Sequence, residues 1–532
     1  MKRYITIAMM VATSVAAMAQ DYTDIERFGR NDAQGSARSQ AMGGAFGALG
    51  GDMSVGDINP AGIGVYRASE FSLSLGVNTT KANTSSDQKF GSPVNGIGDT
   101  RVKLMQLGGV FNTSLIRQAS GVVSHTFSIA YNRIADYDQS YTMHAKNSSN
   151  SLLDFFIADP SADNIYEGGL GWDSEMLFTY YEYEEPRLDA DGNPICDANG
   201  DPIYDTHRVN VDHTAWDFPL ENDDKTEISF DDKYRRRKID ISRHYRERGS
   251  KGSFNVAYAQ NIANKLYWGV NIDFQSYNFK RNFTHVEKFD EEAQYGAPNK
   301  FRYNSRLDQD AFGVSFGAGV IYVPMPVLRL GLAIHSPTFF SVNEVYDTNF
   351  RAGMETECYP EAPFECDYNV TAPARGVFSL AGVIGRLAII SADYEFVGYK
   401  ASKFRSEDNG DDVEFEQMNA YLKEDLKNVH KLRLGAEIKP VQILSLRAGY
   451  KMQSSPYADD LMYNDYKNRD ITGGLGLRFS NIYLDFAYVN HKVVEDAFIL
   501  PGSDYYYYDA SPNPYKMENT SHRVTVTFGY RF

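Results

Sequence analysis

Few residues of this sequence have types and spacings that could do chemistry. The run Gly313-Val314-Ser315-Phe316-Gly317 fits the GxSxG pattern of serine hydrolases. That nucleophile needs a sharp turn between a strand and a helix, whereas this run lies inside an alternating apolar pattern with no helix after it. No histidine has a convincing serine partner either. We therefore expect no enzyme and no catalytic residues.

Two acidic runs, 189–193 and 197–201, imitate the start of a calcium-binding loop. Pro194 and Pro202 stand at the position where an EF-hand needs glycine. Turn chemistry explains both runs, and a loose calcium site is the alternative. We expect no metal site and no cofactor.

The chain has three cysteines, Cys196, Cys358 and Cys366. Cys358 and Cys366 are eight positions apart in a polar segment, which in an oxidising compartment favours a small loop disulfide. Cys196 would then be unpaired. Metal ligation is the alternative, but no histidine or CxxC spacing supports it.

The composition limits the kind of protein that these residues belong to. The chain has 532 residues, a formal net charge of −17, and 14% aromatic residues, with 37 Tyr and 32 Phe. A protein needs a surplus of Lys and Arg to bind nucleic acid well, so no nucleic-acid partner is expected. The chain is also too aromatic to be disordered.

The first nineteen residues predict a signal peptide. Lys2 and Arg3 give a positive start, 5–15 form an apolar core, and Ala17-Met18-Ala19 fits a cleavage site. The mature chain would begin at Gln20. An uncleaved anchor is the alternative, but the apolar stretch is well short of the ~20 residues of a spanning helix.

From residue 70 onward, the dominant signal is an alternation of apolar and polar residues, which predicts β-strands. The last segment is the clearest case, with apolar residues at every second position from Val524 to Phe532. The pattern recurs at 71–78, 268–275, 328–335 and 482–489. The polar face carries Gly, Ser and Ala with isolated charges such as Arg433 and Glu437, which suits a crowded lumen. The other face carries almost no charge, as contact with lipid requires, and a soluble sandwich is the alternative.

The lengths of the connections predict the topology. Short turns are expected at 117–120, 262–265, 324–326, 385–386, 440–442 and 480–481. Long polar connections are expected at 80–100, 146–250, 287–299, 338–367, 399–430, 453–468 and 491–520. Six turns and seven loops join fourteen antiparallel strands and place both strand termini on the short-turn side. Short periplasmic turns and long outer loops are typical of outer-membrane β-barrels, in which closure removes every sheet edge.

A segment rich in Gly and Ala, 20–69, precedes the barrel of 70–532. Its small residues would let it fold tightly inside the lumen, where Arg38, Asp52 and Asp57 could meet charges on the strands. We therefore expect a plug. A flexible periplasmic linker is the alternative.

These residues resemble the FadL/TodX family of outer-membrane transporters of long-chain fatty acids and hydrocarbons. Met42-Gly43-Gly44-Ala45 followed by Asn59-Pro60-Ala61 looks like the hatch of that family, and 312–337 looks like its central hairpin. The expected hatch residues are Arg38, Met42, Gly43, Gly44, Phe46, Asn59, Pro60 and Ala61. The resemblance implies fourteen strands, a hatch that shifts, and a gap in the wall near the third strand. The long Asp-rich loop 146–250 departs from the family, so its substrate preference need not carry over.

Two candidate sites follow for a hydrophobic ligand. Ser151 and Asp154 have capping-box spacing, which predicts a short helix with an external apolar groove; exposed apolar patches usually bind something. The groove residues are Leu152, Leu153, Phe155, Phe156 and Ile157. Packing against the rest of the loop is the alternative. Around Asn132 and Arg133 the strand alternation slips by one residue, which suggests a β-bulge at a lateral opening, unless Arg133 simply lies at the membrane interface.

The sequence therefore predicts passive uptake of hydrophobic small molecules, fatty acids or aromatic hydrocarbons, across the outer membrane. The expected partners are that ligand and the surrounding lipid and lipopolysaccharide, and a monomer is favoured. A surface adhesin or interaction protein on a barrel and a general porin are the alternatives.

Overall fold

The computed structural model describes most of the chain after the first 21 residues. The described residues are 22–32, 34–86, 91–96, 98–115, 121–148, 150–158, 177–189, 193–197, 200–214, 220–221, 228–229, 238–290, 298–353, 356–358, 363–385, 387–407, 413–459, 466–500 and 514–532. The predicted signal peptide lies outside them.

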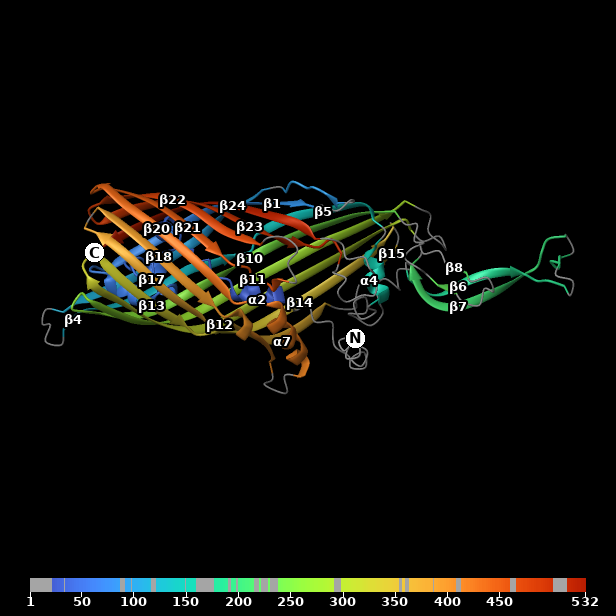
Figure 1. Ribbon diagram of the computed structural model, residues 1–532, viewed down its shortest axis with the longest axis horizontal. Coiled ribbons are helices and arrows are strands. Elements are labelled where there is room, and N and C mark those ends of the chain that lie inside the picture. Colours follow the sequence, from blue (N-terminus) through green and yellow to red (C-terminus); the bar gives the residue numbers. More distant parts are fainter. Residues whose placement is uncertain are drawn as a thin grey trace.

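The chain folds into a closed, antiparallel β-barrel that crosses the wall fourteen times (Figure 1). We call each crossing a stave, whether it consists of one strand or of two consecutive strands in line. Eleven staves contain β1 (Glu70–Ser85), β3 (Asp99–Ser114), β4 (Val122–Asp136) with β5 (Gln139–Ser148), β10 (Ile239–Ile262), β11 (Leu266–Phe289), β12 (Lys300–Met325), β20 (Val429–Val441), β21 (Leu444–Gln453), β22 (Lys467–Phe479), β23 (Ile482–Ala497) and β24 (Tyr515–Arg531). The other three staves are each interrupted: β13 (Leu328–His335) with β14 (Thr338–Ala352), β17 (Arg375–Ile384) with β16 (Phe364–Ala372), and β18 (Ala388–Val397) with β19 (Lys403–Ser406). Proline occupies the breaks at Pro337 and Pro373, where no backbone N–H is available for the ladder.

The remaining elements lie inside the barrel or in its loops. The helices are α2 (Tyr22–Gly29), α3 (Ala37–Ala41), η1 (Met53–Asp57), η2 (Pro60–Val65), α4 (Leu152–Ala158), η5 (Tyr399–Ala401) and α7 (Val413–Asp425). The short strands are β2 (Gly91–Ser92), β6 (Leu177–Pro186), β7 (Tyr204–Thr214), β8 (Leu220–Glu221), β9 (Ile228–Ser229) and β15 (Thr356–Cys358). Among the described helices, none is long and apolar enough to cross a membrane.

The pairing of the first and last strands closes the barrel. β1 pairs with β24 from Glu70 opposite Arg531 to Ser85 opposite Lys516. Both strand termini therefore lie at the short-turn end, as predicted, and the turns between β10 and β11, β12 and β13, and β22 and β23 fall where they were expected. The β6–β7 hairpin projects from the opposite end (Figure 1).

The long connections are shorter than the sequence suggested. β5 and β10 extend into the predicted loop 146–250, so the connection between them runs only from 149 to 238. The predicted loop 338–367 is wrong over most of its length, because β14 and part of β16 occupy it. In these segments the strands continue beyond the ~9 to 11 residues that cross a bilayer, and polar residues replace the outward apolar ones.

The two faces of the strands divide as the alternation predicted. On β1, Phe71 and Leu75 are 50% and 48% exposed, whereas Ser72 and Ser74 between them are buried. The same outward exposure of large apolar residues recurs around the barrel, for example at Phe316, Leu332 and Val524. An apolar outer surface with a polar, filled interior is the arrangement that a bilayer requires.

Candidate functional site

The segment from Tyr22 to Tyr66 is surrounded by barrel strands. Its polar contacts reach four staves, of which only β18 and β20 are neighbours: the Ala37 amide donates to Thr527 Oγ1 on β24, and the Gly47 amide to Asp393 Oδ2 on β18, both at 2.8 Å. Asn132 on β4 and Glu437 on β20 also bond this segment. We call this segment the plug.

Arg38 anchors one side of the plug. Its Nε lies 3.2 Å from Glu437 Oε2, and its guanidinium stacks 5.2 Å from the ring centre of Phe46. Glu437 also meets Arg447 at 2.7 Å, and Arg447 in turn meets Asp485 at 2.6 Å. Lys439 Nζ also lies 3.2 Å from Glu437 Oε1, so Arg38 adds a cation from the plug to a network of paired charges on the wall.

The predicted hatch residues lie where the plug approaches the wall most closely. Met42 and Phe46 are buried in one apolar cluster with Ala333 and Val377 of the strands. A Cβ on Gly43, which has a φ of 64°, would lie 3.0 Å from backbone atoms of Leu434 and Tyr450, so only glycine fits there without strain.

Asn59, Pro60 and Ala61 form the start of η2 against β11 and β12. The Asn59 side chain accepts from the Ala61 amide at 3.1 Å and donates to Gly47 O at 2.7 Å. A Cβ on Gly319 of β12 would lie 2.0 Å from Asn59 Oδ1. The close approach of plug and wall at this point therefore depends on a strand glycine.

Asp57 joins the plug to β4 and β10. Asn132 Nδ2 donates to Asp57 Oδ2 at 2.6 Å, and Ser253 Oγ donates to Asp57 Oδ1 at 2.8 Å. Burial, and then the nearby carboxylate of Asp273, raise the pKa of Asp57 to about 8. Burial and the neighbouring carboxylate therefore favour the protonated form of the carboxyl group at this contact.

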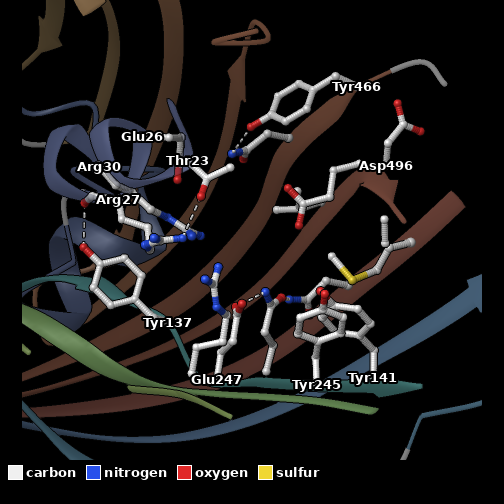
Figure 2. Close-up of a pocket in the computed structure, with 18 of the residues that line it drawn as sticks. Thr23, Glu26, Arg27, Arg30, Tyr137, Tyr141, Tyr245, Glu247, Tyr466 and Asp496 are labelled. Carbon is white, nitrogen blue, oxygen red and sulfur yellow. Dashed lines mark hydrogen bonds between the residues drawn. The ribbon is translucent and has the colours of Figure 1, made fainter. Parts of the chain in front are cut away.

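A cavity of about 800 Å³ lies in the lumen between the plug and the long-loop end of the barrel. Its floor includes α2 of the plug. Figure 2 shows Glu26 and Arg27 of that helix, and Arg30 just after it, facing Tyr141, Tyr245 and Glu247 across the space. The inward side chains of β22, β23 and β24 form another wall.

Most charges on the floor of the cavity are paired within the protein. Arg30 Nε lies 3.1 Å from Asp32 Oδ2, and Lys451 Nζ lies 2.9 Å from Asp470 Oδ2. Burial alone would raise the pKa of Asp32, but Arg30 and Lys451 hold that pKa well below its usual value. The floor is therefore charged and closely packed.

The predicted external groove is a packed element. Leu152, Leu153 and Phe156 of α4 are buried in an apolar cluster with strand residues at the mouth of the barrel, so they form no exposed patch. The predicted capping box is confirmed: the Ser151 amide donates to Asp154 Oδ2 at 2.8 Å, and the Leu153 amide to Ser151 Oγ at 3.1 Å. The side chains of Phe155 and Ile157 lie outside the described structure.

Glu287 of β11 holds α4 in place. It accepts from Ser151 Oγ at 2.5 Å and from the Leu152 amide at 2.7 Å. His285 Nε2 lies 2.7 Å from the same carboxylate, and Arg243 Nε donates to His285 Nδ1 at 2.9 Å. Met517 and Leu500 belong to the apolar cluster of α4 and also line the cavity. This cluster therefore covers the cavity at the mouth of the barrel.

The wall beside the cavity lacks backbone pairing between β3 and β4. Their ladder ends at Gln106 opposite Asn132, although β3 continues to Asp99 along β1 and β4 continues to Asp136 along β10. A β-bulge lies on each strand at this point, at Met105 and at Ile134, because the register skips both residues. The predicted slip beside Arg133 is therefore a bulge.

Side chains cross this gap in place of the ladder. Arg133 Nε donates to Leu104 O at 3.1 Å. On the lumen side, Lys103 Nζ lies 2.6 Å from Asp136 Oδ1 and 2.7 Å from Asp138 Oδ2. Asp136 and Asp138 also line the cavity, so the cavity and the gap share a wall.

The predicted disulfide is wrong. Cys358 pairs with Phe350 and Cys366 with Glu344, both on β14. Six residues along a strand span about 20 Å, whereas the Cα atoms of a disulfide lie within ~7 Å. The two cysteines lie on separate strands, β15 and β16, which pair with different parts of β14.

The sequence did not indicate the residues that line the cavity. They come from the ends of strands such as β22 and β24 that lie nearer the long loops. There Asn468 and Arg523 belong to no recognisable sequence motif. The signal was present only as inward-facing polar positions beyond the membrane-spanning part of each strand.

No protein-family model matches the chain, and no curated protein matches it. Among solved structures, a FadL homologue of Pseudomonas aeruginosa superposes with a TM-score of 0.51 at 11% identity, over 95% of this chain and 100% of that one. The toluene transporters TodX of Pseudomonas putida and TbuX of Ralstonia pickettii give TM-scores of 0.49 and 0.46 at 13% identity, each over 94% of this chain and 99% of theirs. The likeness to the FadL homologue shows that this chain has a FadL-type fold, and so confirms the predicted resemblance at the level of the fold.

Proposed function

We propose that this protein is an outer-membrane channel for the passive uptake of hydrophobic small molecules. The ligand passes the apolar mouth, enters the cavity above the plug and leaves sideways into the membrane between β3 and β4. The observation that carries the proposal is the interrupted ladder beside the cavity, because backbone pairing would otherwise seal the wall. The solved FadL homologue supports the same class of function by fold alone.

A sideways exit suits a ligand that water dissolves poorly. Such a molecule gains free energy in proportion to the apolar surface that it removes from water, so release into acyl chains is favourable and release into the periplasm is not. The plug supports this direction, since it fills the lumen between the cavity and the short-turn end with buried side chains such as Met42, Phe46 and Ile63.

The plug also argues against a general porin. A porin needs a continuous water-filled path, whereas the plug contacts the staves around the lumen through buried hydrogen bonds. We assign it the role of a hatch. The barrel would act as a monomer within lipid and lipopolysaccharide.

The gap can be closed chemically to test the route. Leu104 and Arg133 face outward across it. In a background in which the three native cysteines are replaced by serine, Leu104→Cys with Arg133→Cys can be joined by a short bis-methanethiosulfonate linker, whose two disulfide bonds a reductant cleaves. Cells that express the linked protein should lose at least ~90% of the protein-dependent uptake of a labelled long-chain hydrocarbon or fatty acid, and reductant should restore it.

The matched control is Leu107→Cys with Tyr131→Cys, a pair that is already opposed in the intact β3–β4 ladder. Linking this pair should leave uptake unchanged. Equal uptake with the 104–133 link closed would overturn the lateral route.

The β6–β7 hairpin supports a second candidate function, surface interaction. It projects from the loop end of the barrel (Figure 1). Two of its large side chains are exposed to solvent, Leu188 by 54% and Tyr204 by 50%. A partner bound there would be separate from the uptake route.

A further inference from the structure

The outward apolar surface of the barrel has a sharp upper edge where β24 meets β1. Tyr488 on β23, Val524 on β24 and Val77 on β1 are opposed in turn and are 47%, 48% and 42% exposed. Toward the long loops, no further large apolar side chain is exposed on these three strands as the structure describes them. Acyl chains that surround the barrel therefore end near these residues on this side.

A row of cations lies beyond this edge, nearer the long loops. The cation row consists of outward-facing residues that are directly opposed on β22, β23, β24 and β1: Arg469, Lys492, Thr520 and Lys81. Like charges directly opposite each other, such as Arg469 and Lys492, destabilise a sheet unless something neutralises them. Glu518 Oε1 lies 2.5 Å from Lys492 Nζ and does so for that residue. Among the described residues, none forms an ion pair or a side-chain hydrogen bond with Arg469 or Lys81.

Hydrogen-bonding groups lie between the apolar edge and the cation row. His522 on β24 is exposed and is opposite Asn490 on β23 and Thr79 on β1. Tyr488 Oη lies 2.8 Å and Asn490 Nδ2 lies 3.3 Å from His522 Nδ1. Because an amide NH₂ group can only donate, Nδ1 accepts, and the proton of the neutral ring is on Nε2. This face therefore offers an N–H donor just below two cations.

The opposite side of the barrel has acids in the corresponding place. There, the outward residues that are opposed in turn on β11, β12, β14 and β16 are Asn278, Asp310, Asn343 and Asp367. Three staves separate this acidic row from the cation row on either side. Asn278 Nδ2 donates to Asp310 at 2.5 Å, and Asn343 Nδ2 donates to the next carboxylate at 2.8 Å. Nearby Lys280 and Arg306 both pair with Asp308.

The two rows therefore differ in what they can bind. The acidic row is satisfied within the protein and repels anions. The cation row has charge to spare, directly above an apolar surface, in a chain whose formal net charge is −17. Its complement is an anion carried by a molecule with acyl chains. In an outer membrane, the leaflet on the long-loop side consists of lipopolysaccharide, which carries phosphate directly above its acyl chains.

We infer that the outward face of β22, β23, β24 and β1 is a binding site for the phosphorylated head group of lipopolysaccharide. Arg469 and Lys81 bind phosphate, since guanidinium and ammonium groups form charge-assisted hydrogen bonds with phosphate oxygens. His522 donates a hydrogen bond to the head group, and the acyl chains lie along the apolar surface below. This inference rests on the proposed function, because it takes the long-loop end of the barrel as the outer side.

Native mass spectrometry of the full-length protein, released from detergent micelles, tests the site. The probes are bis-phosphorylated lipid A, the same lipid A with both phosphates removed, and phosphatidylglycerol. Bis-phosphorylated lipid A should bind at least ~10-fold more tightly than either of the others, because it alone combines phosphate charge with a head group that fits the row.

Arg469→Gln with Lys81→Gln removes two cations and keeps long polar side chains. Each cation near a lipid surface contributes about fivefold to affinity, so the double variant should weaken binding of lipid A by ~10- to 30-fold. Binding of the dephosphorylated lipid should stay unchanged. The matched control is Arg246→Gln with Arg302→Gln, which removes two exposed cations from the outward faces of β10 and β12 and should leave every affinity unchanged.

Three results would each overturn this inference: equal affinity for lipid A and its dephosphorylated form, equal affinity for phosphatidylglycerol, or native affinity of the Arg469 and Lys81 double variant. Hydrocarbon uptake is measured separately on the same variants and should stay within about twofold of the native level. Phosphate-selective binding without uptake by the native protein would overturn the proposed function alone.

Discussion

At the scale of residues, Asp57 makes the docking of the plug sensitive to pH. Its pKa is raised to about 8 by burial and by Asp273. A carboxyl with a raised folded-state pKa contributes stability that is complete below its unfolded pKa, near 4, and is lost as the pH rises through the folded value. We expect the thermal unfolding temperature of the purified protein to fall between pH 6 and pH 9.

Asp57→Asn should reduce the fall of the unfolding temperature between pH 6 and pH 9. The amide keeps the shape of the side chain but cannot ionise, so the variant should gain on the order of 2 kcal/mol relative to the native chain at pH 9. Asp52→Asn is the control, because Asp52 is a buried carboxylate of the same plug that caps η1 instead. Identical pH slopes for the native chain and Asp57→Asn would contradict this account of Asp57.

The sequence predicted correctly those contacts that depend on neighbouring residues, and incorrectly those that depend on pairing between distant segments. The Ser151–Asp154 cap depends on a spacing of three, which the sequence contains. The disulfide between Cys358 and Cys366 depended on whether the intervening chain forms one loop, which is set by pairing with β14 and by no local signal.

At the scale of elements, the contact between η2 and β12 depends on Gly319. Valine there would meet Asn59, because a Cβ already comes within 2.0 Å of its Oδ1. We expect Gly319→Val to displace the plug and to destabilise the protein by about 1 to 3 kcal/mol, with increased ion conductance in planar bilayers. Gly382→Val on β17, where a Cβ meets nothing within 4 Å, is the control and should keep the native conductance. Native conductance and stability of Gly319→Val would contradict the role of this contact.

The β6–β7 hairpin separates the two candidate functions. Deletion of 177–214 with a short Gly-Ser linker should leave uptake within about twofold of the native level, because the hairpin pairs with no barrel strand. Binding to a surface partner, if the protein has one, should be lost. Loss of uptake at native expression would show that the hairpin belongs to the transport route.

The staves themselves were predictable, but their upper ends were not. Alternation of apolar and polar residues identifies a strand only while one face meets lipid, as from Phe71 to Val77. Beyond the bilayer the apolar side of β14 turns inward, with Phe340 and Val342 buried and Asn343 outside, so the outward alternation that marks a lipid-facing strand is absent over 338–352. The cavity lies at this height, which is why its lining was missed.

At the scale of the whole molecule, the outward surface assigns the barrel to a lipid environment. Leu332 is 58% exposed on a face shared with Phe316 and Phe378. Leu332→Arg should destabilise the protein in bilayers by about 2 to 4 kcal/mol if this position lies near mid-membrane. Arginine at Tyr322, nearer the short-turn end, should cost less, and equal small effects at both positions would contradict the placement of the membrane.

The most direct test of the account is the identity of what the native protein carries. The protein, purified in lipid nanodiscs from outer membranes of its own host, is analysed by mass spectrometry against empty nanodiscs from the same cells. We expect enrichment of chain-bearing hydrophobic molecules. Enrichment of polar solutes alone would contradict a hydrophobic route through this barrel.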